Sequence, residues 1–158
     1  MYQKWCGNEE KVENSLHYKL RACHTECQKA IVHNIKKQTD LRPGEPKILE
    51  YLAEHEPCEQ KEIAAGCNLD SASVTGILRR MEVRGLIKRE MKNGNRRSLY
   101  VSMTDKGRTL ETQVEKTFAY VDSQAVKGLS EKEINEFLNV LNVINNNLSI
   151  LDESTQDT

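Results

Sequence analysis

The side chains best suited to binding chemistry are basic ones that gather in one short stretch. Residues 70–97 hold eight lysines and arginines against three acids, a local net charge of +5. Guanidinium and ammonium groups at this density favour a phosphate-bearing partner. A solvated helix followed by a charged hairpin edge would explain the same residues, so the choice depends on the elements that carry them. The basic residues are Arg79, Arg80, Arg84, Lys88, Arg89, Lys92, Arg96 and Arg97.

Charge elsewhere in the chain has the opposite sign. The 158 residues contain 23 basic and 24 acidic side chains, for a net charge of −1. Residues 128–158 have one base, Lys132, against six acids, a local net charge of −5. A nearly neutral chain with this segregation has one region suited to phosphate and one that avoids it.

Residues 45–103 predict a helix, a short helix, a turn, a third helix and a two-stranded hairpin. The first helix ends near Glu56, the short one spans about 59–65, and Gly66 after it is expected to take a positive φ. Asp70 caps the third helix, and Gly85 ends it. Two β-prone runs, 86–91 and 98–103, flank Asn93-Gly94, a strong signal for a tight hairpin. The buried face of the third helix is expected to be Val74, Ile77, Leu78 and Met81.

This order of elements is that of a winged helix-turn-helix. One helix fits the major groove, which is about 12 Å wide, and short side chains at its start let the backbone approach the base edges. The positive end of the helix dipole also favours phosphate. The residues expected to contact double-stranded DNA from this helix are Ser71, Ala72, Ser73, Thr75, Gly76, Arg79 and Arg80.

The hairpin, or wing, has its own chemistry. Asn93, Asn95, Arg96 and Arg97 lie at or beside its tip, and guanidinium groups on a protruding ribbon suit the narrow minor groove. The alternative is that Arg97 pairs across the strands with Glu90 in a tight two-residue turn.

Helices with apolar residues at helical spacing flank this module. A first helix is expected over residues 9–38, a fifth from Asp105 until Gly128 interrupts the pattern, and a sixth opened by the capping box Ser130–Glu133. The sequence therefore predicts a mainly α fold with a small β-hairpin.

Several stretches together resemble the MarR family of bacterial transcriptional regulators, over roughly residues 10–150. They are residues 41–49, 60–64, 73–75 with 80–82 and 85–87, and 96–97 leading to 101–107. Residues at four positions depart from the family pattern. Gly76 stands where a base is frequent, Arg79 where an acid is common, Asn95 where Asp is common, and Glu59 where Ser or Thr is expected.

The resemblance implies a homodimer whose first, fifth and sixth helices form the dimerisation arm. It implies segments 1–40 (dimerisation helix), 41–104 (winged helix-turn-helix) and 105–151 (dimerisation helices). The polar residues 152–158 predict a disordered tail. The recognition helix would be about 70–84, and the wing about 92–97. Family members usually act as repressors that a small phenolic or amphipathic ligand, or thiol oxidation, releases from DNA.

The five cysteines allow other interpretations. Their odd number, with no export signal at the N-terminus, favours reduced thiols in the cytoplasm. Cys23 and Cys27 fall on an apolar helical stripe, which predicts core packing. A redox role at Cys6, Cys23 or Cys27, or a metal site that adds His17 and His24, stays an alternative.

Membrane and enzyme functions find no support in the sequence. No apolar run approaches the roughly 18–20 residues that span a bilayer. The four histidines are scattered, and there is no phosphate-binding glycine loop, nucleophile elbow or HExxH motif. We therefore expect no catalytic residue, cofactor or metal. The main prediction is a dimeric repressor that binds an inverted repeat. The alternatives are a thiol- or metal-responsive sensor of the same fold and a winged helix used only for protein contacts.

Overall fold

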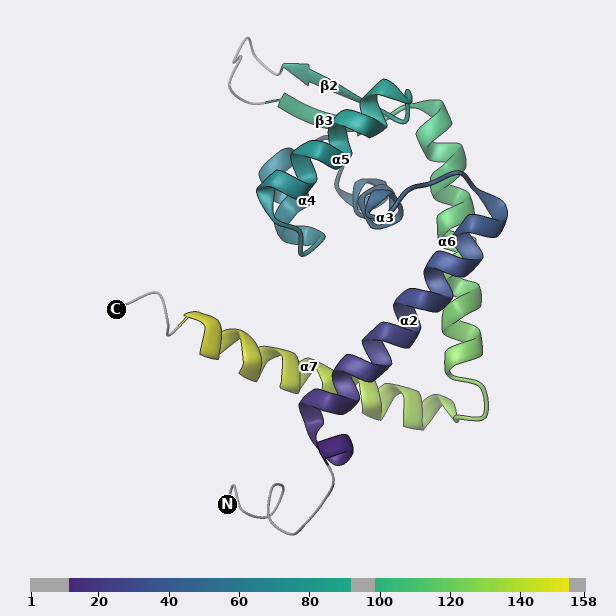
Figure 1. The fold of residues 1–158 in the computed structure, drawn as a ribbon, viewed down its shortest axis with the longest axis vertical. Helices are drawn as coiled ribbons and strands as arrows, with labels where there is room; N and C mark the ends of the chain where they lie inside the picture. Colours follow the sequence, from purple (N-terminus) through teal and green to yellow (C-terminus); the bar gives the residue numbers. More distant parts are fainter. Residues whose placement is uncertain (1–11, 92–98, 154–158) are drawn as a thin grey trace. The chain divides into compact units, whose positions relative to one another are not determined.

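A computed structural model describes residues 12–91 and 99–153 (Figure 1). The chain divides into two compact units, Met1–Val121 and Asp122–Thr158. The expected mainly α fold with a small sheet is confirmed. After a 3-10 turn η1 (Val12–Asn14), the elements are α2 (Leu16–Gln38), α3 (Glu45–His55), β1 (Cys58–Glu59), α4 (Gln60–Gly66), α5 (Ser71–Val83), β2 (Ile87–Met91), β3 (Leu99–Met103), α6 (Asp105–Ala125) and α7 (Glu131–Glu153).

The core of the first unit lies under the helix-turn-helix. Helix α3 contributes three fully buried apolar side chains, and α5 buries the four residues predicted from its sequence pattern. Strands β2 and β3 add Ile87, Val101 and Met103 from one face of the sheet. Each such side chain contributes about 1.5–3 kcal/mol of hydrophobic free energy. The α3 residues are Ile48, Leu49 and Leu52, and those of α5 are Val74, Ile77, Leu78 and Met81.

Two predictions, the start of the first long helix and the number of strands, need correction. The first long helix begins at Leu16 after η1 rather than at residue 9. The sheet has three strands rather than two, because Cys58 and Glu59 pair with Val101 and Tyr100. A two-residue strand is too short to produce an alternating pattern in the sequence.

Gly66 does not take a positive φ. The left-handed residue of this turn is Asn68, with φ 50°, while Gly66 is the last residue of α4. A Cβ on Gly66 would lie 2.0 Å from the Tyr51 ring. Glycine is thus needed there for close packing between α3 and α4, and asparagine, which tolerates the left-handed region, makes the turn.

The hairpin register excludes a tight two-residue turn with Arg97 opposite Glu90. Ile87 pairs with Met103 and Glu90 pairs with Tyr100, so residues 92–98 connect the strands after Met91. The tight turn would shift the pairing by three residues. Because an odd shift reverses the faces of one strand relative to the other, Ile87 could not then face the core together with Val101 and Met103. Burial of these three side chains therefore favours the observed pairing.

The predicted C-terminal end of α5 and the predicted N-terminal capping box of α7 are confirmed. Gly85 has φ +70° and ends α5 in a Schellman motif, in which Leu86 N donates to the Met81 carbonyl (2.9 Å). In the second unit, Ser130 N donates to Glu133 Oε2 (2.8 Å) and Glu133 N donates to Ser130 Oγ (3.3 Å). Among residues 131–151 of α7, no side chain is buried in the chain taken alone. No helix in the described residues is long and apolar enough to cross a membrane.

Gly107 in the first turn of α6 sets how closely this helix approaches Leu86, the residue just before β2. A Cβ built on it would lie 2.1 Å from the Leu86 carbonyl oxygen, which also accepts from Thr104 N at 3.1 Å. The obstacle is backbone, so a side chain cannot move aside to relieve the contact.

We therefore expect Gly107→Ala to lower the free energy of unfolding by about 2 kcal/mol or more, because α6 must shift away from the sheet. Gly76→Ala is the matched control. Its Cβ would meet nothing closer than 3.8 Å, and replacing glycine within a helix should stabilise by up to about 1 kcal/mol. Urea unfolding of the two variants gives both values, and equal stabilities would contradict this account of Gly107.

Candidate nucleic-acid interface

Helix α5 separates its core face from a polar face at its start. Asp70 caps it as predicted, accepting from Ser73 N (2.8 Å) and Ser73 Oγ (2.5 Å). The Ser73 hydroxyl, followed by its backbone N–H, lowers the pKa of Asp70, which keeps the cap ionised at neutral pH. The structure brings the seven predicted helix residues onto one side, opposite the buried face. Ser71, Ala72, Ser73, Thr75 and Arg79 are exposed, and Gly76 and Arg80 are half-buried.

Gln60 is a polar residue of this surface that sequence reasoning missed. It is the first residue of α4 and is half-buried. Its Nε2 donates to Thr75 Oγ1 (2.5 Å), and Thr75 Oγ1 donates to the Ser71 carbonyl (2.8 Å). The two partners lie fifteen residues apart, so neither helical nor strand periodicity connects them. Only the helix-turn-helix assignment itself could have suggested the pair.

Three of the eight basic residues are occupied within the protein. Arg89 bonds Glu82 through Nε (3.1 Å) and Nη2, and this contact lowers the pKa of Glu82. Lys88 lies 3.2 Å from Glu90, and Arg84 belongs to the cluster described next. By contrast, Arg79 and Arg80 have no ion pair or hydrogen bond from their side chains in the described residues. Among the five basic residues that the structure describes in this stretch, the charge free to meet phosphate is thus that of Arg79 and Arg80 on α5.

Arg84 and Glu45 form a nearly buried ion pair behind the helix-turn-helix. Glu45 is fully buried, and its Oε2 accepts from Arg84 Nη1 (2.5 Å) and from Arg42 N (2.9 Å). Arg84 Nη2 contacts the Asp40 carboxylate (2.7 Å), and this bond lowers the pKa of Asp40. Lys106 Nζ donates to the Arg84 carbonyl (3.0 Å). The cluster therefore fastens the C-terminal end of α5 to the loop between α2 and α3.

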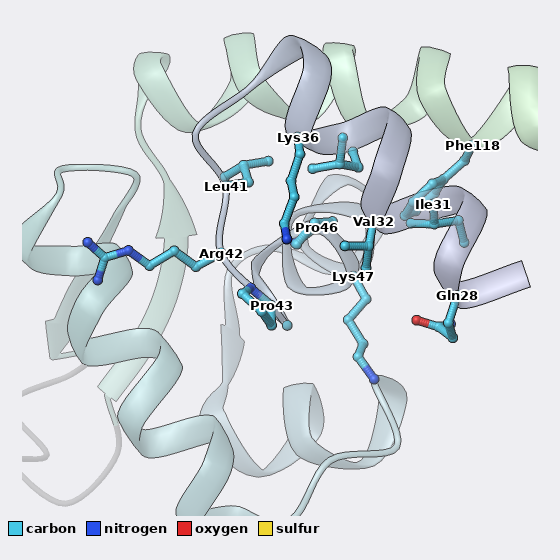
Figure 2. Close-up of a pocket in the computed structure, with 12 residues that line it drawn as sticks. Gln28, Ile31, Val32, Lys36, Leu41, Arg42, Pro43, Pro46, Lys47 and Phe118 are labelled. Atoms are coloured by element: carbon cyan, nitrogen blue, oxygen red, sulfur yellow. The ribbon is translucent and has the colours of Figure 1, made fainter. Parts of the chain in front are cut away.

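The same loop borders a small cavity of about 120 Å³. Figure 2 shows Ile31 and Val32 of α2, Leu41 and Pro43 of the loop, and Phe118 of α6 around it. Three basic residues, Lys36, Arg42 and Lys47, also line it. In Figure 2 the Arg42 guanidinium group points away from the cavity, and Lys47 Nζ donates to the Cys67 carbonyl (3.2 Å). An apolar hollow with the Lys36 amino group at its border suits an amphipathic anion.

The wing residues Asn93, Asn95, Arg96 and Arg97 lie outside the described residues. What the structure does describe is the base of the wing, strands β2 and β3, which pair with each other, and β2 contacts α5. Tyr100 in β3 donates from its hydroxyl to Glu59 Oε1 (3.3 Å), joining the wing to the start of α4. The roles of these four residues stay predictions.

The cysteine prediction was wrong for the chain taken alone. Cys23 and Cys27 are exposed, whereas Cys58 and Cys67 are buried. The apolar stripe of α2 predicted a core face, but only Ile35 of this helix is buried in the single chain. Burial raises the pKa of Cys58 to about 11, so its thiol is protonated at neutral pH. Among the described residues, no three His, Cys, Asp or Glu side chains are placed to hold a metal.

A helix-turn-helix with a strand hairpin beyond its second helix defines a winged-helix protein. The MarR family model matches residues 41–99. The HTH-type regulators YkoM of Bacillus subtilis and MgrA of Staphylococcus aureus are 28% and 24% identical over 136 and 135 residues. These alignments cover 85% of this chain and 88% and 90% of those proteins.

Solved structures agree with this assignment. The repressor CouR, bound to a 23-mer DNA duplex, superposes with a TM-score of 0.76 at 25% identity, over 87% of this chain and 99% of that one. A probable transcriptional regulator of Pseudomonas aeruginosa gives 0.74 at 25% identity, over 85% and 99%. Residues 41–99, the helix-turn-helix and its strands, thus match the MarR family of transcriptional regulators.

The ion pair behind α5 gives a stability prediction. Arg84→Met would leave the Glu45 carboxylate buried beside a single backbone N–H, so we expect a loss of about 3 kcal/mol in the free energy of unfolding. Adding Glu45→Gln removes the uncompensated charge and should recover most of that loss. Arg79→Met, a similar change on the exposed side of α5, should stay within about 0.5 kcal/mol of wild type. Denaturant unfolding measures all four proteins, and a double variant no more stable than Arg84→Met would contradict the role of the ion pair.

Proposed function

We propose that the protein is a dimeric, sequence-specific repressor of transcription that binds an inverted repeat in double-stranded DNA. The observation that carries the proposal is the polar start of α5. Seven small or basic residues share one side of it, while the opposite side is fixed in the core. The relatives named above are transcriptional regulators, and CouR has been solved on a DNA duplex, which supports the same use of α5 here.

The dimer is supported by apolar surface that the single chain leaves exposed. On α7, five large apolar side chains within residues 137–148 are about half exposed, and on α2 Leu16 and Val32 are exposed. A soluble monomer rarely keeps this much apolar area in contact with water. We infer that the arms 1–40 and 105–151 cover it with a second copy, as the family resemblance implies. Light scattering should then give twice the chain mass of 18.1 kDa. The five on α7 are Phe137, Leu138, Val140, Val143 and Leu148.

Selection from randomised duplexes at moderate salt tests the DNA-binding proposal. An enriched inverted repeat, with half-sites about one helical turn apart, would support a dimeric regulator. Binding that falls with salt but enriches no site would leave only non-specific electrostatic binding. No retained duplex would favour the winged helix used for protein contacts alone. A promoter carrying the selected site, fused to a reporter, then distinguishes repression from activation.

Two arginines should behave differently on the selected site. We expect Arg97→Ala to weaken binding to all sequences alike and to reduce the salt slope by about 1, as loss of a backbone contact in the minor groove does. Arg79→Ala should lower affinity and also change the preferred bases. Lys29→Ala, on α2 outside the module and paired with Glu26, is the control with unchanged affinity. An Arg97→Ala protein with wild-type affinity would remove the wing from the proposal.

A small aromatic carboxylate is the effector that best fits the cavity between α2, the loop and α6. Its apolar lining and basic border match a ring with an acidic group, and its wall shares the loop that Glu45 ties to α5. Among the structural neighbours, CouR has been solved with p-coumaroyl-CoA, and DNA binding by BpsR of Bordetella bronchiseptica is regulated by 6-hydroxynicotinic acid.

We therefore expect 4-hydroxybenzoate to raise the unfolding temperature and release operator DNA, whereas its uncharged amide does so less. At a hundredfold excess over its Kd the ligand would stabilise by about 2.7 kcal/mol. Ile31→Trp, at a lining residue outside the apolar surface named for the dimer, fills the cavity and should bind DNA without responding to the ligand. An Ile31→Trp protein that responds like wild type would place the effector elsewhere. Release by mild peroxide instead, with an adduct on Cys23 or Cys27, would favour the thiol sensor.

A further inference from the structure

We infer that Gln60, in α4 rather than in the recognition helix, reads an adenine in the major groove, and that Thr75 holds its carboxamide in place for that contact. The inference rests on the proposed DNA-binding function and adds a specificity-determining residue to it.

The hydroxyl hydrogen of Thr75 is committed within the protein. It goes to the Ser71 carbonyl (2.8 Å), and one lone pair of the oxygen accepts from Gln60 Nε2 (2.5 Å). A threonine hydroxyl has one proton to donate, so Thr75 has none left for a base. It can still offer DNA the second lone pair of its oxygen and its methyl group, which suits the methyl of thymine.

The carboxamide of Gln60 retains unused capacity. It has two N–H donors and one oxygen acceptor, and only one N–H is engaged, by Thr75. Within residues 12–91 and 99–153, no other hydrogen bond from this side chain is present. The side chain thus combines a fixed position with one free donor and one free acceptor beside the polar start of α5.

That donor–acceptor pair matches adenine among the four bases. In the major groove adenine presents N7 as acceptor and its N6 amino group as donor, and glutamine binds both. Guanine presents two acceptors there, which leaves the glutamine oxygen unpaired. A thymine beside that adenine would meet the Thr75 methyl, so the two residues suit an A·T-containing step.

A phosphate contact fits this position less well. Glu59 and Glu62 flank Gln60, and the Glu62 carboxylate is held there because it accepts from Glu59 N (2.6 Å). Lys61 pairs with Glu59 (2.9 Å), so residues 59–62 carry a net charge of −1. A negative neighbourhood opposes a phosphate but not the uncharged edge of a base.

The test compares base discrimination rather than affinity alone. After selection of the operator with wild-type protein, each adenine of a half-site is replaced in turn, and Kd is measured for wild type, Gln60→Ala, Thr75→Val and the double variant. We expect wild type to lose about tenfold at one adenine and Gln60→Ala to be indifferent there while keeping its other preferences. Thr75→Val keeps the shape of the side chain but removes the anchor, so it should weaken the same discrimination, and the double variant should lose no more than Gln60→Ala.

Lys61→Ala is the control on the neighbouring exposed residue and should keep the adenine preference. Thermal unfolding checks that every variant is folded. If Thr75→Val does not fold, Gln60→Ala alone decides whether Gln60 reads the adenine. If wild type selects no site, the proposed function itself fails. If wild type selects a site and Gln60→Ala reads it unchanged, only this inference is overturned. An equal loss by Gln60→Ala on every sequence would identify a phosphate contact and would also overturn it.

Discussion

The burial of one carboxylate organises the module that carries α5. Glu45 has no exposed surface, and a buried charge is tolerated only where partners compensate for its lost hydration. Arg84 supplies the opposite charge from the end of α5, and Arg42 supplies a backbone N–H from the loop. This requirement fixes where α3 begins, where α5 ends and how the loop beside the cavity runs. The same loop brings Gly44 against Ile77, since a Cβ there would lie 2.6 Å from the Ile77 side chain.

Local chemistry made most of the fold predictable from the sequence. Asp70, Gly85 and the Ser130–Glu133 box act within a few residues of themselves, so their signals are complete in the sequence, and the helix ends followed from them. The strand register did not follow, because Asn93-Gly94 indicates a tight turn locally while the joint burial of Ile87, Val101 and Met103 favours a different pairing. Gly66 shows a similar limit, since the ring of Tyr51 that demands glycine is brought there by tertiary packing.

The candidate site was predictable in its members but not in its bonding. Exposure of Ser71, Ser73, Thr75 and Arg79 follows from helical periodicity once the buried face is known. Periodicity cannot show that Arg84 and Arg89 are neutralised by distant or cross-element acids, nor that Gln60 donates to Thr75. The composition counts these side chains as available to bind DNA, whereas in the structure they form contacts within the protein. The prediction for the cysteines of α2 failed for a related reason, because an apolar stripe does not reveal whether another part of the chain packs on it.

Helix α5 is constrained unequally along its length, and this has a consequence for evolution. At its C-terminal end, loss of Arg84 leaves the buried Glu45 carboxylate without an opposite charge, so a change there requires either a destabilised intermediate or a second substitution at Glu45. At its N-terminal end, Ser71, Ala72 and Ser73 project to solvent, and single substitutions leave the fold intact. Paralogues that arise by gene duplication can therefore diverge one residue at a time in what α5 contacts, while inheriting its placement unchanged.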